Sequence, residues 1–209
     1  MILLFKTEQE EFWAGEFGNQ YIQRNQGVTL VARNIALFTK ILTYTKSIQS
    51  IIEFGSNIGL NLIAIKHLLP KVELSSIEIN SQAVEKLKSN IKEIKIYHQS
   101  ILDFVPDYQR DLVLVKGVLI HINPDMLNKT YALLYQTSRR YICIVEYYNP
   151  TPVEVPYRGN SNVLFKRDFT GELLDKYQDL KLIDYGFVYH RDNNFPQDDF
   201  NWFLLEKVN

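Results

Sequence analysis

The sequence predicts an α/β fold: a mostly parallel, seven-stranded Rossmann-like sheet with one antiparallel strand near the C-terminus and an N-terminal helical cap. Through the middle of the chain, short apolar segments rich in β-branched residues alternate with amphipathic helical segments. Strands that alternate with helices form βαβ units, whose strands are parallel and whose helices cover the sheet. Near the C-terminus two strand-like segments follow one another without a helix, which is typical of antiparallel neighbours.

The elements are expected in a definite order. Apolar residues recur at helical spacing over residues 8–45, with a break near residues 25–27. The expected strands then cover residues 50–54, 72–79, 95–98, 112–116, 140–147, 180–190 and 201–207, and the expected helices cover residues 60–69, 81–91, 124–138 and 168–177. Ser81 is expected to cap the second of these helices. We treat residues 1–209 as a single domain, with residues 1–46 as the cap and residues 47–209 as the core.

The composition indicates an ordinary globular protein. Of the 209 residues, 46% are hydrophobic and 22% are charged, which supplies enough apolar sequence for a full core. The formal net charge is −1, from 23 basic and 24 acidic residues. This balance argues against a broad surface for nucleic acid or for an anionic membrane, although it leaves room for a small cationic pocket.

Cysteine and histidine usage predicts neither a disulfide nor a metal site. Cys143 is the single cysteine and lies in an apolar run, so we expect a buried core thiol rather than a nucleophile. The four histidines are scattered along the chain, so no metal-ligand cluster is expected. The apolar patch at residues 1–5 is too short for a signal peptide, and no apolar stretch approaches ~18 residues. We therefore expect a cytoplasmic protein without a membrane span.

The strongest local signal is the segment from Glu53 to Gly59, at the first strand-to-helix turn, where open α/β sheets bind ligands. Gly55 permits a sharp turn before Ser56, and Gly59 is expected to let a ligand lie against the backbone. A dinucleotide site would carry glycine at the position of Asn57, so the spacing resembles instead the first motif of S-adenosylmethionine-dependent methyltransferases. Glu53 is expected to contact the ammonium group of that cofactor. The alternative is an ordinary tight connection.

Polar residues at the ends of the next two strands extend this site. Glu78 ends the second strand near the spacing of a ribose-binding acid, followed by Ile79. A carboxylate there accepts hydrogen bonds from both ribose hydroxyls, whereas the alternative is a solvated glutamate at a strand end. Ser100 and Ile101 end the third strand, where methyltransferases contact the adenine edge. A helix cap is the alternative for Ser100.

The fourth strand leads into a second candidate segment. The corner at Lys116 and Gly117 is expected to border the methionine end of the cofactor. The run that follows resembles the strand-to-helix motif of small-molecule methyltransferases, in which a histidine often lies near the transferred methyl group. If the acceptor is a hydroxyl, His121 is our candidate general base, because the unperturbed pKa of histidine is near neutral. The alternative is a histidine that only packs.

Several runs over nearly the whole chain point to one family. They are F-W-A-G-E-F-G at 12–18 with Tyr21, Arg24 and Asn25, G-V-L-I-H-I-N-P at 117–124, E-Y-Y-N-P at 146–150, Y-R-G at 157–159, K-R-D-F at 166–169, D-Y-G-F at 184–187 and F-P-Q-D-D at 195–199. Together they resemble the pseudaminic acid biosynthesis-associated methylases. The resemblance implies methyl transfer from S-adenosylmethionine, with S-adenosylhomocysteine as product, and a nonulosonic sugar or its nucleotide-activated form as acceptor.

The cap is expected to cover the cofactor. Trp13, Tyr21 and Arg24 have helix-compatible spacing, and the two aromatic rings are placed to lie near the sulfonium or the acceptor. Packing of the cap on the sheet is the alternative for Trp13.

The acceptor is expected above the ends of the fourth and fifth strands. Tyr147, Tyr148 and Asn149 are candidates to orient it by hydrogen bonds, and aromatic packing is the alternative for both tyrosines. Arg158, in a loop flanked by glycine and proline, is a candidate to bind a carboxylate of an anionic sugar. His190 lies on the last loop, which either closes over the pocket or solvates a hairpin.

Two other functions remain open on the sequence alone. One is an NAD-dependent sugar oxidoreductase, against which the missing middle glycine counts. The other is a methyltransferase-like protein that binds the cofactor without turnover and serves as a scaffold in a sugar biosynthesis complex. In each case the expected partner is a small molecule rather than nucleic acid or membrane, and the oligomeric state is open.

Overall fold

The structure is a computed structural model that describes residues 5–208 of the chain. Residues 1–4, which hold most of the apolar N-terminal patch, lie outside the described residues. Three helices come first: α1 (Glu8–Ala14), α2 (Glu16–Arg24) and α3 (Val28–Leu42). The expected break after α2 is present. A second break, at Gly15, was not predicted, because the apolar spacing continues across it.

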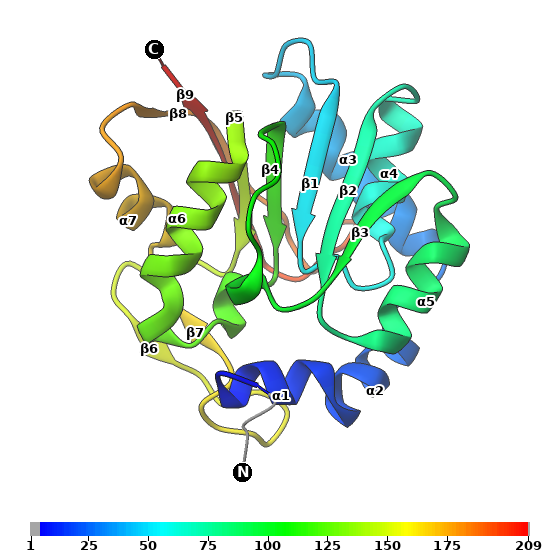
Figure 1. Cartoon of the computed structure of the whole chain (residues 1–209), viewed down its shortest axis with the longest axis vertical. Helices are drawn as coiled ribbons and strands as arrows, with labels where there is room; N and C mark the ends of the chain where they lie inside the picture. The colour runs from blue at the N-terminus through cyan, green and yellow to red at the C-terminus, as the bar shows by residue number, and fades with distance from the viewer. Residues whose placement is uncertain (1–4, 209) are drawn as a thin grey trace.

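Seven strands form one sheet in the order β3-β2-β1-β4-β5-β9-β8, as Figure 1 shows. The strands are β1 (Ser50–Phe54), β2 (Glu73–Glu78), β3 (Ile94–His98), β4 (Arg110–Lys116), β5 (Ser138–Glu146), β8 (Leu180–Phe187) and β9 (Asn201–Lys207). β9 runs antiparallel to both β5 and β8, and the pairs among β1 to β5 are parallel. The predicted sheet, with its single antiparallel strand, is therefore confirmed.

Helices cover both faces of the sheet. α3, α4 (Leu60–Leu68) and α5 (Ser81–Asn90) pack on one face, and α6 (Leu127–Thr137) and α7 (Phe169–Lys176) pack on the other. Because side chains alternate along a strand, neighbouring residues of β1 enter different cores: Ile51 packs with α3 and α4, and Ile52 packs with α6. Strands buried on both faces explain the nearly continuous apolar runs in the sequence.

The cap lies across the carboxyl ends of the parallel strands. Figure 1 shows α1 and α2 at that edge, beside a hairpin of β6 (Val153–Glu154) and β7 (Phe165–Lys166). The hairpin was not predicted, because strands of two residues leave no periodic pattern. Three 3-10 helices were also not foreseen as separate elements: η1 (Ile101–Asp103), η2 (Leu119–His121) and η3 (Pro124–Met126).

The cap is tied to the core through Asn80, and this residue corrects one prediction. The N-cap of α5 is Asn80, not Ser81: the Asn80 side chain accepts a hydrogen bond from the amide of Ala83 at 3.0 Å. Its Nδ2 also donates to the Trp13 carbonyl at 3.1 Å and to Asn19 Oδ1 at 2.9 Å. A single side chain thus starts α5 and holds the junction of α1 and α2.

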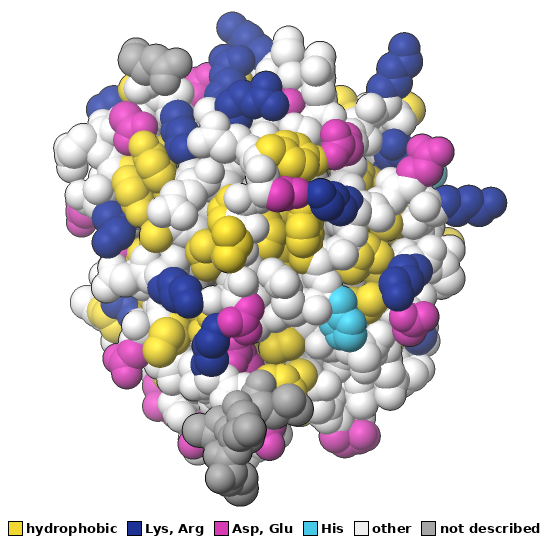
Figure 2. Space-filling view, viewed as in Figure 1, with side chains coloured by type: hydrophobic (Ala, Val, Ile, Leu, Met, Phe, Trp, Pro, Cys, Tyr) yellow, Lys and Arg dark blue, Asp and Glu magenta, His cyan; other side chains and the backbone are white. Residues whose placement is uncertain are grey.

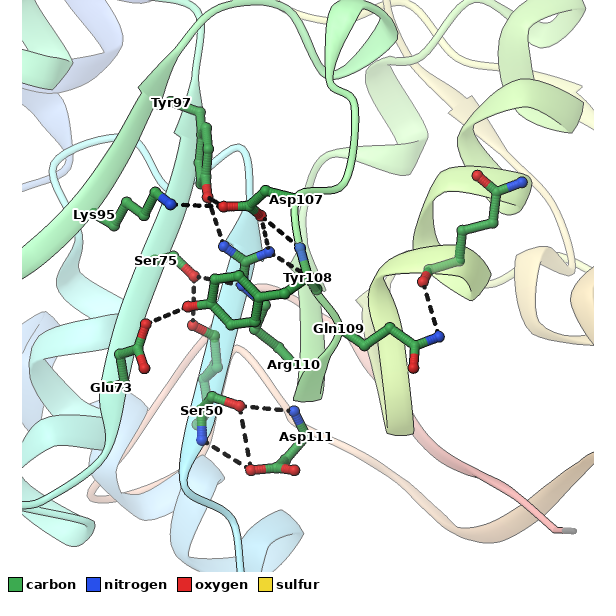
Figure 3. Close-up of polar contacts among 12 residues, drawn as sticks. Ser50, Glu73, Ser75, Lys95, Tyr97, Asp107, Tyr108, Gln109, Arg110 and Asp111 are labelled. Atoms are coloured by element: carbon green, nitrogen blue, oxygen red, sulfur yellow. Dashed lines mark hydrogen bonds and ion pairs between the residues drawn. The ribbon is translucent and has the colours of Figure 1, made fainter.

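The connection from β3 to β4 contains only the short helix η1, so a polar cluster takes the place of a crossover α-helix (Figure 3). At its centre, Arg110 is fully buried, with its guanidinium carbon 3.6 Å from the ring centroid of Tyr108. Arg110 donates to Asp107 at 2.5 Å, to the Tyr97 hydroxyl at 2.6 Å and to Ser75 Oγ at 3.2 Å. On this side of the molecule, Figure 2 shows hydrophobic side chains at the surface between α6 and β3, with interspersed basic and acidic side chains.

Two further observations concern the described residues. Cys143 lies in the core at 1% exposure, as predicted, and residues 5–208 hold no cluster of three potential metal-ligating side chains. No helix within that range has the length and apolar character needed to cross a bilayer.

Candidate functional site

A cavity of about 450 Å³ lies between the carboxyl ends of the parallel strands and the cap. It is bordered by the β1–α4 turn, the ends of β2 and β4, the segment around η1, helices α1 to α3, and residues 196–200. This is the edge at which open α/β sheets bind ligands. The cavity lining includes thirteen residues that the sequence nominated: Trp13, Tyr21, Arg24, Gly55, Ser56, Asn57, Glu78, Ile79, Ser100, Ile101, Lys116, Gly117 and His121.

The glycine turn at β1–α4 has the sharp geometry that was predicted. Gly55 has φ +73°, and a Cβ there would lie 2.7 Å from Val118 Cγ2, so a side chain at this position would be both strained and blocked. Asn57 has φ +49°, in the left-handed region that asparagine tolerates better than most residues. Asn57 therefore supplies the backbone conformation of a middle glycine while adding an amide side chain to the cavity wall.

Gly59 requires a correction. It was expected to let a ligand approach the backbone, but it does not belong to the cavity lining. Gly59 is the N-cap of α4 with φ +82°, and a Cβ there would lie 2.3 Å from Leu87 Cδ1 of α5. The glycine is needed for the close packing of α4 on α5, because any side chain would displace Leu87.

Glu78 ends β2 with its carboxylate at the cavity. Its Oε2 accepts the Asn57 amide at 2.7 Å and its Oε1 accepts the Asn80 amide at 2.8 Å. Each oxygen retains a second lone pair, so both oxygens can accept a further hydrogen bond from a ligand. Burial raises the pKa of Glu78, whereas the backbone hydrogen bonds act in the opposite direction. The backbone bonds fix the carboxylate in one orientation.

Glu53 lies beneath the cavity rather than in its wall. It is fully buried, and its Oε1 accepts Asn61 Nδ2 at 2.6 Å. Asn61 does line the cavity, so it stands between Glu53 and a ligand. Burial raises the pKa of Glu53 to about 8, although Asn61 and Lys116 act to lower it. Glu53, which was predicted to contact an ammonium group, is thus connected to the cavity through Asn61, a residue that the sequence analysis missed.

Replacing Glu53 by glutamine is expected to flatten the pH dependence of folding stability. The pKa of about 8 in the folded state exceeds the ordinary value of 4.5, so the folded protein holds this proton more tightly than the unfolded chain. The contribution of Glu53 to stability is full below pH 4.5 and is lost as the pH rises toward 8. Urea unfolding at about pH 5 and about pH 8.5 should show a smaller loss in the variant than in the wild type.

The control is Glu93→Gln, which changes an exposed carboxylate in the same way and should reproduce the wild-type pH dependence. Equal losses in Glu53→Gln and wild type would show that the buried carboxyl is already ionised in the folded protein at neutral pH.

One end of the cavity carries charges of both signs. Lys116 lies here with Nζ 5.1 Å from the Phe200 ring centroid, and burial lowers its pKa, against the effect of nearby Glu53 and Asp198. Arg33 of α3 also lines this end. Arg33 and Asp198 were not predicted as site residues. The signal for Arg33 was the polar pair Arg33 and Asn34 inside the otherwise apolar run of α3.

The opposite end is formed by η1 and α1. Ser100 Oγ accepts the Leu102 amide at 2.9 Å, so Ser100 caps η1 and also lines the cavity. Its hydroxyl is hydrogen-bonded to Glu10 of α1, a further lining residue that the sequence analysis did not single out. Both interpretations of Ser100, as a cap and as part of the cavity wall, therefore describe the same side chain.

His121 lies in η2, buried among aromatic rings. Its ring centroid is 4.6 Å from that of Trp13 and 5.3 Å from that of Tyr157. Nδ1 contacts the Val163 carbonyl, which only accepts hydrogen bonds, so Nδ1 carries the proton and Nε2 is free to accept one. Burial lowers the pKa of His121 to about 4, although the bond to Val163 raises it. The ring is therefore neutral at physiological pH.

The structure does not bring the five predicted acceptor residues into the cavity lining. Tyr147 contacts a lining residue, because its ring stacks on that of Phe200 with ring centroids 4.7 Å apart. The others lie elsewhere: Tyr148 is 42% exposed, Asn149 bonds to Thr151, Arg158 is exposed on a turn with φ +49°, and His190 pairs with Asp199. These placements follow from the loops after β5 and β8, whose paths are set by distant contacts rather than by local sequence.

Several buried polar atoms at the cavity have no hydrogen-bond partner among the described residues. They are Trp13 Nε1, Arg33 Nε, Asn57 Oδ1 and Asn61 Oδ1 in the wall, and Glu53 Oε2 beneath it. Buried polar groups are normally satisfied, because an unpaired one costs about 1–3 kcal/mol. Donors and acceptors thus lie together in one cavity, which suits a ligand with polar groups of both kinds.

Comparison with solved structures identifies the fold. The chain is similar to the 1,6-didemethyltoxoflavin-N1-methyltransferase of Burkholderia thailandensis, solved with 1,6-didemethyltoxoflavin and S-adenosylhomocysteine, with TM-score 0.68 and 10% identity over 96% of this chain and 87% of that one. It is also similar to magnesium protoporphyrin IX methyltransferase of Synechocystis PCC 6803 with bound S-adenosylmethionine (TM-score 0.63, 10% identity, 97% and 98% covered).

A third similar structure is the plantazolicin methyltransferase BpumL with S-adenosylhomocysteine, at TM-score 0.63 and 16% identity over 96% of this chain and 94% of that one. No protein-family model and no curated protein matches the sequence. At these identities the similarity shows the fold alone. The chain has the Rossmann-like fold of class I S-adenosylmethionine-dependent methyltransferases.

Proposed function

We propose that the protein transfers a methyl group from S-adenosylmethionine to a small polar acceptor and releases S-adenosylhomocysteine. The observation that carries this proposal is the pairing of Glu78 with the glycine turn at the edge of a 450 Å³ cavity. The Asn57 amide binds the Glu78 carboxylate directly, so the turn and the ribose-binding acid form one rigid unit. The methyltransferase fold and the cofactors held by the similar structures support the same conclusion.

The nucleoside end of the cofactor fits the region between Glu78 and η1. Both Glu78 oxygens can accept ribose hydroxyls, and charge-assisted hydrogen bonds of this kind are about twice as strong as neutral ones. Ile79 follows as an apolar wall, and Ser100 with the backbone at Ile101 borders the adenine edge. The adenosine end of this cofactor is uncharged and carries no phosphate, so Glu78 does not repel it.

The amino-acid end fits the mixed charges at the other end of the cavity. Arg33, with its unpartnered Nε, and Lys116 suit a carboxylate, and Glu53 with Asn61 suits an ammonium group. Gly117 brings the backbone of β4 to the same place. An arriving ammonium group also favours the ionised form of Glu53, whose pKa is otherwise raised to about 8 by burial.

The sulfonium fits beneath the aromatic cap. Trp13 and Tyr21 lie edge to face with ring centroids 5.3 Å apart, and both line the cavity. Aromatic faces attract a cation electrostatically, by about 0.5–2 kcal/mol. Arg24 ends α2 beside them, at the rim of the same cavity.

The acceptor is expected to be anionic, as the resemblance to the pseudaminic acid methylases suggests. Arg24, Arg158 and Lys166 form no ion pair with any described carboxylate, so each is available to an anionic ligand. Of the three, Arg24 lines the cavity, whereas Arg158 and Lys166 lie outside its lining and would reach an acceptor only after movement of their loop. A nonulosonic sugar, or its nucleotide-activated form, carries the carboxylate or phosphate that these cations would bind.

His121 is the proposed general base for a hydroxyl acceptor on its geometry alone, because burial lowers its pKa to about 4 and removes the near-neutral pKa on which the sequence argument rested. Its Nε2 is free to accept a proton, and transfer also requires the oxygen to lie in line with the S–CH₃ bond, so positioning supplies part of the rate. The other acceptor candidates stay as predictions, because their loops would have to move before the side chains reach the cavity. They are Tyr147, Tyr148, Asn149 and His190.

The first experiment is calorimetric titration of the protein with S-adenosylmethionine, with S-adenosylhomocysteine and with NAD. We expect both adenosyl compounds to bind and NAD to show no binding. A folded protein that binds neither adenosyl compound would remove the proposal, and selective NAD binding would favour the oxidoreductase.

A second assay distinguishes a catalytic methyltransferase from a non-catalytic scaffold protein that only binds the cofactor. Transfer of a labelled methyl group should be measured on a panel of acidic sugars and their nucleotide forms, with neutral sugars as controls. Cofactor binding without transfer to any acceptor would favour the non-catalytic scaffold. We further propose that residues 1–209 form one domain, with residues 1–46 as its cap, and that the protein is cytoplasmic.

A further inference from the structure

A buried carboxylate outside the cavity holds the segment that carries His121. Glu146, the last residue of β5, is 2% exposed. Its Oε1 accepts the backbone amides of Val118 and Leu119, both at 2.9 Å. These amides begin η2, whose last residue is His121. A carboxylate that accepts several successive amides fixes a backbone segment much as a helix N-cap does.

The segment held in this way reaches two parts of the proposed site. The Val118 side chain packs against Gly55 at the glycine turn, as the blocked Cβ position of Gly55 shows. One helical turn later, His121 packs against Trp13 of the cap. The backbone at Gly117 is fixed separately, by a bond from its amide to the Val145 carbonyl at 2.9 Å. Glu146 therefore bonds to the backbone that carries Val118 and leads to His121, and Glu146 itself does not belong to the cavity lining.

We propose that Glu146 is a positioning residue whose carboxylate keeps η2 and the His121 imidazole in place. We propose also that its hydrogen bonds to the η2 amides weaken when Glu146 takes up a proton. The consequence for methyl transfer rests on the proposed function. The positioning itself is a property of the protein alone, and it is testable without any cofactor or acceptor.

The surroundings of Glu146 make proton uptake accessible near neutral pH. Burial raises the pKa of Glu146 to about 7, although the amide bonds and Lys116 of β4 act to lower it. From α6, Tyr131 faces the same region, and its hydroxyl donates to Glu172 of α7 at 2.7 Å. Glu146 Oε2 is buried and has no partner among the described residues, so it is the oxygen that receives the proton.

Protonation changes the strength of the amide bonds. Hydrogen bonds to an ionised carboxylate are about twice as strong as those to a neutral group, so the hold on Val118 and Leu119 weakens when Glu146 becomes neutral. His121 cannot itself respond in this range, because burial lowers its pKa to about 4. A change at His121 with a midpoint near pH 7 would therefore report Glu146.

The test is a pH titration of the histidine side chains by long-range proton–nitrogen NMR, with no ligand added. In the wild type, the His121 ring signals should keep the neutral Nδ1–H pattern and shift with a midpoint near pH 7. In Glu146→Gln, which mimics the protonated carboxyl, these signals should not change with pH in that range. Signals of His121 are assigned by their loss in His121→Asn.

The control is Glu93→Gln, the same change at an exposed glutamate far from η2. It should leave the His121 midpoint near pH 7. A His121 response that persists in Glu146→Gln, or a wild-type response that is flat through neutral pH, would overturn the proposal. If Glu146→Gln does not fold, the wild-type amide signals of Val118 and Leu119 decide the matter, since both should shift with the same midpoint.

The outcome is independent of the function proposed above. Failure to bind S-adenosylhomocysteine would leave the His121 titration unaffected, and a flat titration would leave cofactor binding unaffected. The two conclusions therefore fail separately.

Discussion

Replacing Glu78 by alanine is expected to weaken S-adenosylhomocysteine binding by at least about 100-fold. The variant loses two charge-assisted hydrogen bonds to the ribose, each contributing about 1.5–3 kcal/mol, and 2.8 kcal/mol corresponds to about 100-fold in Kd. It also frees the Asn57 amide, now held at 2.7 Å by Glu78 Oε2, so the glycine turn loses its anchor. Calorimetric titration of the purified variant measures the change directly.

The matched control is Glu73→Ala, at the opposite end of β2. This glutamate is exposed and bonds to the Tyr108 hydroxyl, far from the carboxyl ends of the strands, so its loss should leave the affinity within about threefold. A folded Glu78→Ala protein with wild-type affinity would show that the carboxylate serves the turn alone. The ribose site would then have to be sought elsewhere.

The parts of the site that could be predicted from sequence are those formed by consecutive residues. The first buried strand ends in glycine, and the next strand ends in Glu78. This local pattern predicts both the turn and the edge of the sheet at which it lies. Parallel pairing then places Phe54 of β1 beside Ile77 of β2, which brings the turn and Glu78 together. The half of the cavity proposed for the cofactor follows from these few facts.

The rest depends on contacts between segments far apart in the sequence. Gly59 was assigned to a ligand because glycine allows close approach, but local sequence does not reveal that the partner in close approach is Leu87 of α5. Arg33 and Asp198 reach the cavity only because α3 and the loop before β9 close over it. For the same reason, Tyr148 and His190 were expected at the acceptor and lie on exposed loops.

The cluster around Arg110 shows a similar limit. The spacing between β3 and β4 predicts a crossover, and a βαβ unit normally supplies a helix there. The segment is instead folded around a buried guanidinium, a solution that needs Asp107, Tyr108 and Tyr97 together (Figure 3). Sequence periodicity does not predict such an arrangement, because the residues of the cluster lie on strands and on an irregular loop.

Replacing Arg110 by methionine is expected to lower the free energy of unfolding by about 3 kcal/mol. Methionine fills much of the volume but donates no hydrogen bond, so the Tyr97 hydroxyl and Ser75 Oγ lose their partner and Asp107 loses a cation. Urea unfolding at neutral pH measures the loss. The control is Arg139→Met, whose ion pair with Asp111 spans 3.5 Å at an exposed position and should contribute under about 1 kcal/mol.

The pH dependence of the same variant separates charge from packing. Burial alone would raise the pKa of Asp107, but hydrogen bonds from Lys95, Tyr97 and Arg110 hold it well below its ordinary value of 3.8. A depressed pKa adds stability above pH 3.8, and this contribution is lost as the pH falls further. Arg110→Met should therefore lose less stability than the wild type on acidification below about pH 4. If both proteins lose the same amount, Lys95 and Tyr97 alone stabilise the Asp107 charge, and the guanidinium contributes through its packing under Tyr108.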